Sequence, residues 1–529
     1  YYAVCKKISQ LIILFIFFFF DFARLIMEGP RYIVNAITFP DIKVFKKEEL
    51  MPALSLIGNM PYSSKKMRDD IRMVRSYYGS RGYADVSVIP DVREIEGAKV
   101  DILYRITTGT RKRVGLVNIQ GNTKSQDRVI RREVPMQPGE FYNSVDLETT
   151  KRRLKNLGYF QDVQVTGAAS SQEGYRDVNI LVQEQRTGTI NFGLGFSSID
   201  SILGRINLEQ SNFDITNWGR FTGAGQRFSV NLQVGSQRTD FRVSLVEPWF
   251  LGQKLSLGTD LYYRDLIFLS PEYDQTNVGA SVFLRKPVGR RSYIKGEYRV
   301  ETIEIEAEND TSQVFKDEED KYLRSALSLN YVYDSRDSNR LPRRGHKVDL
   351  GLIYAGGLLA GDVDTMTFTG SGTKHWSLPF DTILTARGSF AVVDSHGGDD
   401  NLPIFERQFL GGARDLRGFQ FRDIGPRDAT GPNATQEVLG GATSVFGSLE
   451  FTFPVIGQVR GAVFYDAGFV NSDSWDFNTG RLASDVGIGV RLNLPGIGPL
   501  AVDFAVPVET PDDQADDGSQ IQFYMDYQF

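Results

Sequence analysis

The stretch GTINFGLGFS (188–197) sets the pattern for most of the chain. Apolar residues at positions 190, 192, 194 and 196 alternate with polar or glycine residues at the positions between them. Because side chains of a β-strand point alternately to opposite faces, this period of two predicts a strand with one apolar and one polar face. The same alternation returns in QRFSVNLQVG (226–235) and in the C-terminal stretch QIQFYMDYQF (520–529). The chain from residue 188 onward is therefore predicted to be mostly β-sheet.

The number and length of these strands favour a membrane barrel over a large soluble β-protein, which would also show alternation. We count about sixteen alternating segments after residue 187, many near the roughly 10 residues that a tilted strand needs to cross a bilayer. Only a closed barrel can place so much strand in lipid without unpaired backbone at an edge. An aromatic residue at the C-terminus is also typical of outer-membrane barrels. We therefore expect a 16-stranded antiparallel transmembrane β-barrel over residues 187–529.

The composition of the 529 residues agrees with this class and excludes others. Glycine (52), phenylalanine (36) and tyrosine (23) are abundant, and no apolar run is long enough for a membrane-spanning helix. One cysteine and three histidines cannot build a disulfide framework or a Cys/His zinc site, so we expect no metal, no cofactor and no enzymatic activity. The net charge of −6 argues against a nucleic-acid partner. The acidic runs 317–320 and 512–517 are interpreted as solvated loop tips.

The N-terminal segment 1–27 is set apart from the fold. Lys6 and Lys7 precede the apolar run 11–20, which has the charge and length of a secretory signal. Residue 1 is Tyr, however, and no small-x-small cleavage site follows before Met27. The segment is either a partial export signal or foreign sequence joined to a shortened gene.

Two similar segments lie between this stretch and the barrel. RYIVNAITF (31–39) and RKRVGLVNI (111–119) are 80 positions apart, as are PYSS at 61 and FYNS at 141. A helical stretch, a Gly-Tyr pair and two strands follow in each copy, giving the order strand, helix, helix, strand, strand. The repeat predicts two small α+β domains, at residues 28–108 and 109–186. This order resembles that of POTRA domains, whose exposed sheet edges can accept a strand from an unfolded client by β-augmentation.

The long segment 396–441 interrupts the alternating strands. Within it, RQFLGGARDLRGFQFRDIGP (407–426) is too apolar for a solvated loop, so we expect it to fold into the barrel lumen. An Arg in the lumen needs carboxylates. Glu450 lies between Leu449 and Phe451 in a strand whose apolar residues face outward, and Asp466 lies in FYDAG (464–468). We expect Arg417 to pair with Glu450 and Asp466 and to tie the loop to the inner wall.

Several motifs together resemble those of BamA-like outer-membrane β-barrel assembly factors. LRGF is similar to their (V/I)RG(F/Y) loop signature, with Leu416 in place of Val or Ile. Other segments typical of that family are EPWF (247–250), DSRD with PRRG (334–345), SLEF (448–451) and FYDAG. The similarity runs from about residue 28 to the end. Members usually carry five POTRA domains where this chain shows two, so we interpret it as a fragment or a shortened relative. The loop signature itself comprises Leu416, Arg417, Gly418 and Phe419.

The resemblance implies folding and insertion of β-barrel proteins into the outer membrane of a Gram-negative bacterium, with the POTRA domains in the periplasm. Clients would enter through a weak lateral seam between the first and last strands, and Gly193 and Gly195 lower the strand propensity there. Implied partners are outer-membrane lipids, unfolded barrel clients and accessory assembly lipoproteins. The residues assigned to the seam are Ile190, Phe192, Gly193, Gly195, Phe523, Met525, Tyr527 and Phe529.

A transporter of the two-partner-secretion type is the alternative, because it shares two POTRA domains and a 16-stranded barrel. The number of modules favours it, whereas EPWF and the other barrel motifs argue against it. A passive porin is disfavoured by the repeated domains and by the loop expected in the lumen.

Overall fold

The computed structural model describes residues 31–40, 42–197, 201–309, 311–339, 341–396, 402–428, 436–494, 498–512 and 518–525. The chain divides into two compact units, Tyr1–Gln185 and Arg186–Phe529. The signal-like segment 1–27 lies outside the described residues, as do Tyr527 and Phe529 of the expected seam. Among the helices that are described, none has the length and apolar character needed to span a membrane.

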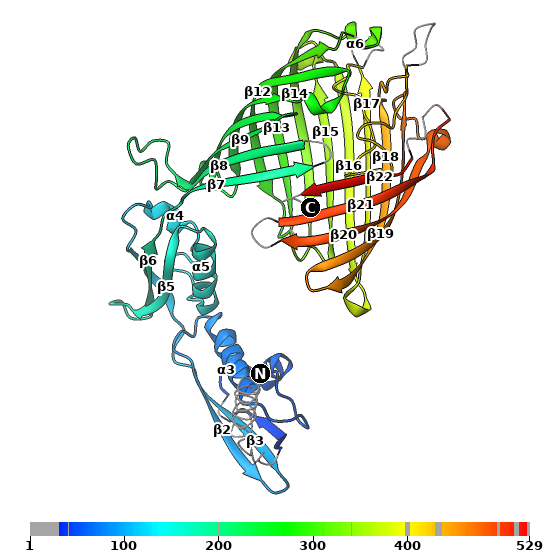
Figure 1. The fold of residues 1–529 in the computed structure, drawn as a ribbon. Coiled ribbons are helices and arrows are strands. Elements are labelled where there is room, and N and C mark those ends of the chain that lie inside the picture. Colours follow the sequence, from blue (N-terminus) through cyan, green and yellow to red (C-terminus); the bar gives the residue numbers. More distant parts are fainter. Residues whose placement is uncertain are drawn as a thin grey trace, which may run out of the picture. The chain divides into compact units, whose positions relative to one another are not determined.

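The first unit contains two modules with the same order of elements, as the repeat predicts (Figure 1). Each module is a three-stranded sheet whose first strand is parallel, and whose second strand is antiparallel, to the central third strand. The first module consists of β1 (Ile33–Thr38), α2 (Lys47–Leu50), the 3₁₀ turn η1 (Met51–Ala53), α3 (Ser64–Gly79), β2 (Ser87–Ile95) and β3 (Lys99–Thr107). The second consists of β4 (Arg113–Gln120), α4 (Asp127–Arg131), α5 (Ser144–Asn156), β5 (Phe160–Ala169) and β6 (Tyr175–Glu184).

In each sheet, the two edge strands differ in how well their outer edges are covered. The edge of β1 is partly covered, because Val34 N–H donates to the Met60 carbonyl at 2.8 Å, and Val114 N–H of β4 donates to Glu140 in the same way. Within the described residues no strand pairs with the outer edges of β2 and β5. Each module therefore presents one free strand edge.

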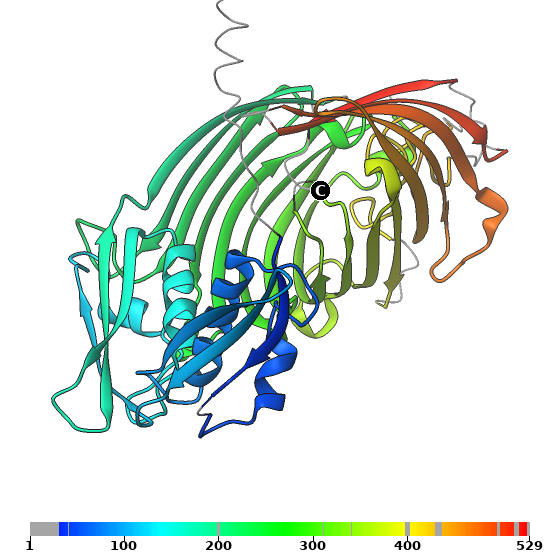
Figure 2. The same cartoon turned by 90° about the horizontal axis from the view of Figure 1, so that it is seen from below.

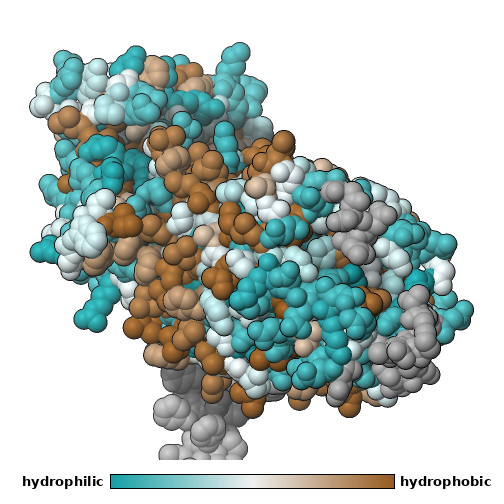
Figure 3. Space-filling view, turned by 90° about the horizontal axis from the view of Figure 1, so that it is seen from above, coloured by the Kyte–Doolittle hydropathy of each residue, from teal (hydrophilic) through white to brown (hydrophobic). Residues whose placement is uncertain are grey.

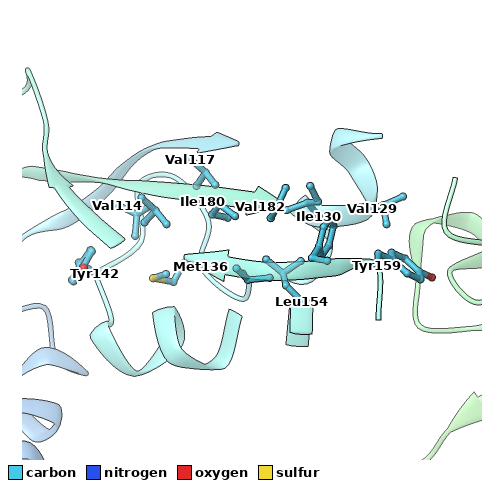
Figure 4. Close-up of a cluster of buried hydrophobic side chains, with 13 residues drawn as sticks. Val114, Val117, Val129, Ile130, Met136, Tyr142, Leu154, Tyr159, Ile180 and Val182 are labelled. Atoms are coloured by element: carbon cyan, nitrogen blue, oxygen red, sulfur yellow. The ribbon is translucent and has the colours of Figure 1, made fainter. Parts of the chain in front are cut away.

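Helices pack over one face of each sheet and close a small apolar core. In the second module Leu154 of α5 and Ile130 of α4 lie against Val114, Ile180 and Val182 of the sheet, and all five are buried (Figure 4). Burying each such side chain contributes about 1.5–3 kcal/mol, which accounts for the persistence of so small a domain.

Local signals set the limits of the main helices. The side chain of Ser63 accepts a hydrogen bond from Lys66 N–H before α3, and Asn143 caps α5 through Val145 N–H. Gly158 follows α5 with φ of +72°, a conformation that glycine adopts without steric cost. Strand β5 then begins at Phe160, as the Gly-Tyr motif predicts.

The second unit is a barrel of sixteen antiparallel strands, β7 to β22, in sequence order around the ring (Figures 1 and 2). The expected fold class is confirmed. The strands are β7 (Gly188–Ser197), β8 (Ser201–Phe213), β9 (Gln226–Gly235), β10 (Thr239–Glu247), β11 (Ser256–Asp265), β12 (Tyr273–Pro287), β13 (Ser292–Ala307), β14 (Lys321–Asp334), β15 (Gly345–Ala355), β16 (Thr365–Ser377), β17 (Ile383–Ser395), β18 (Thr443–Ile456), β19 (Val459–Asn471), β20 (Ala483–Leu494), β21 (Gly498–Glu509) and β22 (Gln520–Met525).

The alternating residues of each strand point to the two faces of the barrel wall, apolar residues outward and polar residues into the lumen. Phe192 and Leu194 of β7 are 77% and 78% exposed on the outside, whereas lumen-facing Asp466 and Asp503 are buried. Brown apolar side chains gather in a band on this surface, with teal hydrophilic side chains on either side (Figure 3). An apolar band flanked by polar rims is the surface that a bilayer requires.

The segment after β17 returns into the barrel, as the sequence predicts, and lies inside the ring of strands (Figure 2). Leu410, Leu416 and Phe419 of this segment are buried. They pack against lumen-facing Phe446 of β18 and Val470 of β19. The apolar residues therefore form a small core between the loop and the wall.

One interpretation of the sequence was wrong for Glu318, in the connection between β13 and β14. We expected the acidic run 317–320 to be solvated, but Glu318 accepts hydrogen bonds from Arg407 at 2.6 Å and from Ile404 N–H at 2.7 Å. Both partners belong to the lumen segment, which is remote in sequence. Glu318 therefore helps to hold this segment in place.

Candidate functional site

The loop signature forms a tight turn, residues 416–419, at the tip of the lumen segment. A bridge between Leu410 and Ile424, with N–H to carbonyl distances of 3.0 and 2.9 Å, closes the base of this turn. The carboxylate of Asp415 accepts hydrogen bonds from the N–H groups of Gly411 and Leu416 at 2.7 and 2.8 Å. Burial raises the pKa of Asp415 to about 7, although both backbone donors oppose this rise. The turn is thus held rigidly enough to present one side chain to the wall.

That side chain is Arg417, which is 0% exposed. Its Nε and Nη2 donate to the two oxygens of Asp466 at 2.6 and 2.9 Å, in the bidentate geometry that suits a guanidinium. Nη1 donates to Glu450 at 2.7 Å and more weakly to Asp503 at 3.3 Å. The structure therefore brings together Arg417, Glu450 and Asp466, which the sequence analysis had placed in one group.

Sequence reasoning missed two further members of this group. Arg491 of β20 donates to Glu450 at 2.6 Å and also binds Asp503 of β21. Both residues stand between outward-facing apolar neighbours, so the parity that identified Glu450 could have identified them too. We call the five residues Arg417, Glu450, Asp466, Arg491 and Asp503 the lumen ion cluster.

The surroundings of Arg417 explain the neighbouring residue types. The guanidinium carbon lies 3.3 Å from the ring centroid of Phe464, the first residue of FYDAG, in a cation–π contact. A Cβ atom on Gly418 would lie 2.5 Å from Cβ of Asp485 and 3.2 Å from the backbone nitrogen of Pro507. Only glycine at position 418 therefore lets the turn approach β20 and β21 closely enough for Arg417 to reach its partners.

The lumen ion cluster stabilises the folded loop because each of its charged groups has at least one partner of opposite charge. Three carboxylates and two guanidiniums share a region in which an unpaired charge would be costly. Removing one partner from such a buried network typically costs about 3–5 kcal/mol. The five residues of the cluster do not form a pair of nucleophile and base. Their ion pairs fasten the loop to the inner wall of the barrel.

The loop turn also reaches the last strand. The side-chain nitrogen of Gln522 in β22 donates to the Phe419 carbonyl at 3.2 Å, and Gln522 is buried. On the other side, Arg387 of β17 donates to the Arg414 carbonyl at 3.3 Å. Residues 414–419 therefore contact strands from β17 to β22, up to the seam.

At the seam, β22 pairs with β7 through one residue pair of the described residues, Tyr524 with Ser197. Every other neighbouring pair of strands in the barrel has a longer ladder, and β7 alone has ten paired positions with β8. The edge of β7 from Gly188 to Gly195 thus carries no described pairing toward β22. Ile190 and Phe192 of β7 and Phe523 and Met525 of β22 lie in these two strands, where the sequence analysis assigned them.

Steric crowding does not explain the seam glycine Gly193. A Cβ atom there would meet only Cβ of Arg205, at 4.0 Å. Glycine in a strand interior lowers strand stability and removes a packing side chain. The first strand is thus weak by composition, and among the described residues it also has a short ladder toward β22.

A barrel with two small α+β modules before it, a loop clamped in its lumen and a poorly paired seam defines a class of membrane assembly and translocation proteins. Family models agree: residues 220–529 match the Omp85 superfamily domain, and residues 32–109 and 112–185 each match a POTRA repeat, described as the surface antigen variable number repeat. The chain belongs to the Omp85 superfamily. It is an outer-membrane β-barrel protein with N-terminal POTRA domains, and this membership supports the expectation that it is not an enzyme.

Individual relatives narrow the comparison. The chain is 26% identical over 512 residues to the outer membrane protein assembly factor BamA of Nitratidesulfovibrio vulgaris, covering 94% of this chain and 62% of the relative. It is 24% identical over 502 residues to BamA of Neisseria meningitidis, covering 89% and 60%. The chain thus spans less than two thirds of the length of these relatives.

Solved structures show the same fold. BamA from Haemophilus ducreyi lacking POTRA domains 1–3 superposes with a TM-score of 0.78 at 22% identity, covering 93% of this chain and 99% of that one. CdiB from Acinetobacter baumannii gives a TM-score of 0.51 at 14% identity, covering 94% and 91%.

Proposed function

We propose that this chain folds β-barrel proteins and inserts them into the bacterial outer membrane through the seam between β7 and β22. The observation that carries the proposal is the single described residue pair that joins these strands in an otherwise continuous barrel. The free edge of β7 can template a client strand by backbone hydrogen bonding, as exposed strand edges do. The names of the BamA relatives support the same activity.

In this mechanism no covalent bond is made or broken. A client strand arriving from the periplasm first pairs with a free edge, for which β2 and β5 of the modules are candidates. It then pairs with β7, whose backbone groups toward β22 have few competing partners among the described residues. Further strands follow, until the client closes on itself and leaves into the bilayer. Unfolded barrel proteins, outer-membrane lipids and accessory lipoproteins are the proposed partners.

The role we propose for the lumen ion cluster is to keep the barrel competent for insertion. Opening the seam removes hydrogen bonds between β7 and β22, so the remaining wall needs another source of rigidity. Arg417 supplies it by joining the loop turn to β18, β19 and β21, and Gln522 extends this tie to β22. The seam can then open without loss of the C-terminal half of the barrel.

The decisive experiment locks the seam. Ser197→Cys with Tyr524→Cys, in a full chain whose Cys5 is replaced by serine, places a cysteine pair at the one described cross-seam position. In proteoliposomes the oxidised protein should insert a denatured client barrel far more slowly than the reduced protein. A matched pair at a sealed ladder, Asn207→Cys with Asn231→Cys between β8 and β9, should insert equally in both states. Equal insertion by the locked and the reduced seam would refute the mechanism.

The second candidate, a transporter for one secreted partner, is favoured only by the number of described modules and by the fold shared with CdiB. Depletion in the native bacterium separates the two. Loss of many outer-membrane barrels indicates the assembly factor, whereas loss of a single secreted protein indicates the transporter.

A further inference from the structure

Positive charge gathers at one rim of the barrel. Strand β7 starts at this rim, which we call the entry rim, and because successive strands reverse direction, the turns after β12, β14, β16 and β18 lie there too. The described residues of the turns VGRR (288–291) and SRDSN plus LPRR (335–339 and 341–344) contain five arginines and one aspartate. The opposite rim has the reverse sign in the described connection between β13 and β14, with DEED at 317–320. The net charge of −6 hides this separation.

The basic turns are joined to their neighbours. The N–H of Asp334 donates to the Arg291 carbonyl at 2.8 Å, which brings the first two turns together. Asp381, in the turn after β16, pairs with Arg343 at 2.8 Å and with Arg460 of β19 at 3.0 Å. We call residues 288–291, 335–339, 341–344 and 378–382, together with Arg460, the basic arc.

Three of the six described arginines of the basic arc remain available to a ligand. Arg290 and Arg291 are exposed, and no ion pair is described for either of them. The side chain of Arg344 is 80% exposed and only 3.9 Å from its partner Asp337. An exposed pair of this kind contributes little and leaves the guanidinium free to bind an anion.

Apolar side chains project from the same turns. Phe380 is 93% exposed and has φ of +57°, a left-handed conformation that costs a residue with a side chain about 1–2 kcal/mol. Val288 and Leu341 are 54% and 45% exposed beside the arginines. In water this display of strained, exposed apolar groups would be unfavourable. Arginines next to exposed aromatic and aliphatic side chains at the edge of a lipid-facing wall are typical of a membrane interface.

We propose that the basic arc binds the headgroups of anionic phospholipids in the leaflet at the entry rim, with Phe380 inserted among their acyl chains. The phosphate groups would accept hydrogen bonds from Arg290, Arg291 and Arg344. Strand β15 is eight strands from β7 in a ring of sixteen, so the arc is centred on the wall across from the seam. It therefore anchors the stationary side of the barrel. This inference requires only the membrane barrel and is independent of the proposed insertion activity.

A soluble acidic protein would satisfy the arginines but not Phe380 and Val288, which stand at the ends of strands whose outer face is apolar. Lipid satisfies both. The electrostatic contribution should also weaken as salt rises, because the arginines are exposed.

The headgroup test uses the detergent-solubilised full chain and native mass spectrometry with phosphatidylglycerol and phosphatidylcholine. Wild-type protein should bind phosphatidylglycerol more tightly, and Arg290→Gln with Arg291→Gln should weaken that binding at least about fivefold, on the basis of roughly 1 kcal/mol per basic residue near a membrane surface. The matched control is Arg220→Gln with Lys254→Gln, two exposed bases at the same rim outside the arc. Unchanged heat-resistant migration on gels shows that each variant is folded.

Three results would overturn the proposal. The first is that the wild type shows no preference for phosphatidylglycerol, and the second is that the control pair loses as much binding as the arc variant. The third is that a polyglutamate peptide displaces the lipid at low concentration, which would indicate an acidic protein ligand.

A depth measurement gives an independent check. A nitroxide label at Phe380→Cys, in a chain with Cys5→Ser, should be accessible to oxygen but not to a water-soluble nickel complex in vesicles. A label at Lys316→Cys, in α6 (Gln313–Lys316) at the opposite rim, should show the reverse. High nickel accessibility at position 380 would exclude insertion.

Discussion

Replacing Arg417 by alanine should release the lumen loop. The variant removes the bidentate bonds to Asp466 at 2.6 and 2.9 Å and the bond to Glu450 at 2.7 Å. Glu450 and Asp503 then keep Arg491 as their cationic partner, whereas Asp466 loses the arginine that it binds in the cluster. Breaking a buried ion network in this way costs about 3–5 kcal/mol. At a denaturant dependence of about 2 kcal/mol per molar urea, the unfolding midpoint of the barrel should fall by about 2 M.

The assay is urea unfolding of the full chain in vesicles, followed by the heat-resistant migration of the folded barrel and by protease cleavage within the lumen segment. Cleavage should appear in Arg417→Ala before the barrel unfolds, because the loop is released first. Arg417→Lys should recover only part of the loss, since an ammonium cannot make the planar bidentate contact. Adding Asp466→Asn to Arg417→Ala should also recover part of it, because this removes a carboxylate that has lost its partner.

The matched control is Lys321→Ala, which removes an ion pair with Glu304 at 2.7 Å whose lysine is 64% exposed. Exposed pairs contribute about 0–1 kcal/mol, so its midpoint should move by less than about 0.5 M. If Arg417→Ala behaved like this control and its loop stayed resistant to protease, the clamp role of Arg417 would be wrong.

Three further predictions concern the seam and the turn. Gly193→Val should strengthen β7, because valine favours strands and a Cβ at this position meets no atom closer than 4.0 Å. The variant should insert clients more slowly and unfold at a higher urea concentration. Faster insertion would contradict the argument that a weak first strand assists insertion. Gln522→Leu should lower the stability of the barrel by about 1 kcal/mol, because the hydrogen bond to the Phe419 carbonyl is lost. Spin labels on β7 and β22 should then report a wider distribution of distances across the seam. An unchanged distribution would show that the loop does not influence the seam. The pKa of Asp415, about 7 in the folded loop, lies above its unfolded value near 4, so the folded loop binds the extra proton and its stability should fall as the pH rises from about 4 to 7. Asp415→Asn should flatten that slope in protease-protection measurements, and a slope of the opposite sign in the parent protein would rule out this carboxyl as its source.

The sequence by itself determined the class of fold. A period of two sustained from GTINFGLGFS to QIQFYMDYQF can be satisfied in lipid only by a closed barrel, because every backbone group must find a partner. Strict alternation also assigned Glu450 to the lumen, since its neighbours Leu449 and Phe451 face outward. The repeated order of elements predicted the two modules in the same way. Strand formation, the facing of a side chain and the order of elements are local properties, so they can be predicted from short stretches of sequence.

Only the tertiary structure decided which residues meet. Arg491, Asp503 and Gln522 have the same parity as many other lumen-facing residues, and their contacts with the loop depend on the register and tilt of five neighbouring strands. The sequence likewise treated Glu318 as solvated, because nothing nearby shows that the lumen segment folds back toward it. The basic arc arises for the same reason: three turns and the start of β19, far apart in the chain, become neighbours once alternate turns of the barrel return to one rim. These contacts form only when the strands close into the barrel, so no short stretch of sequence can predict them.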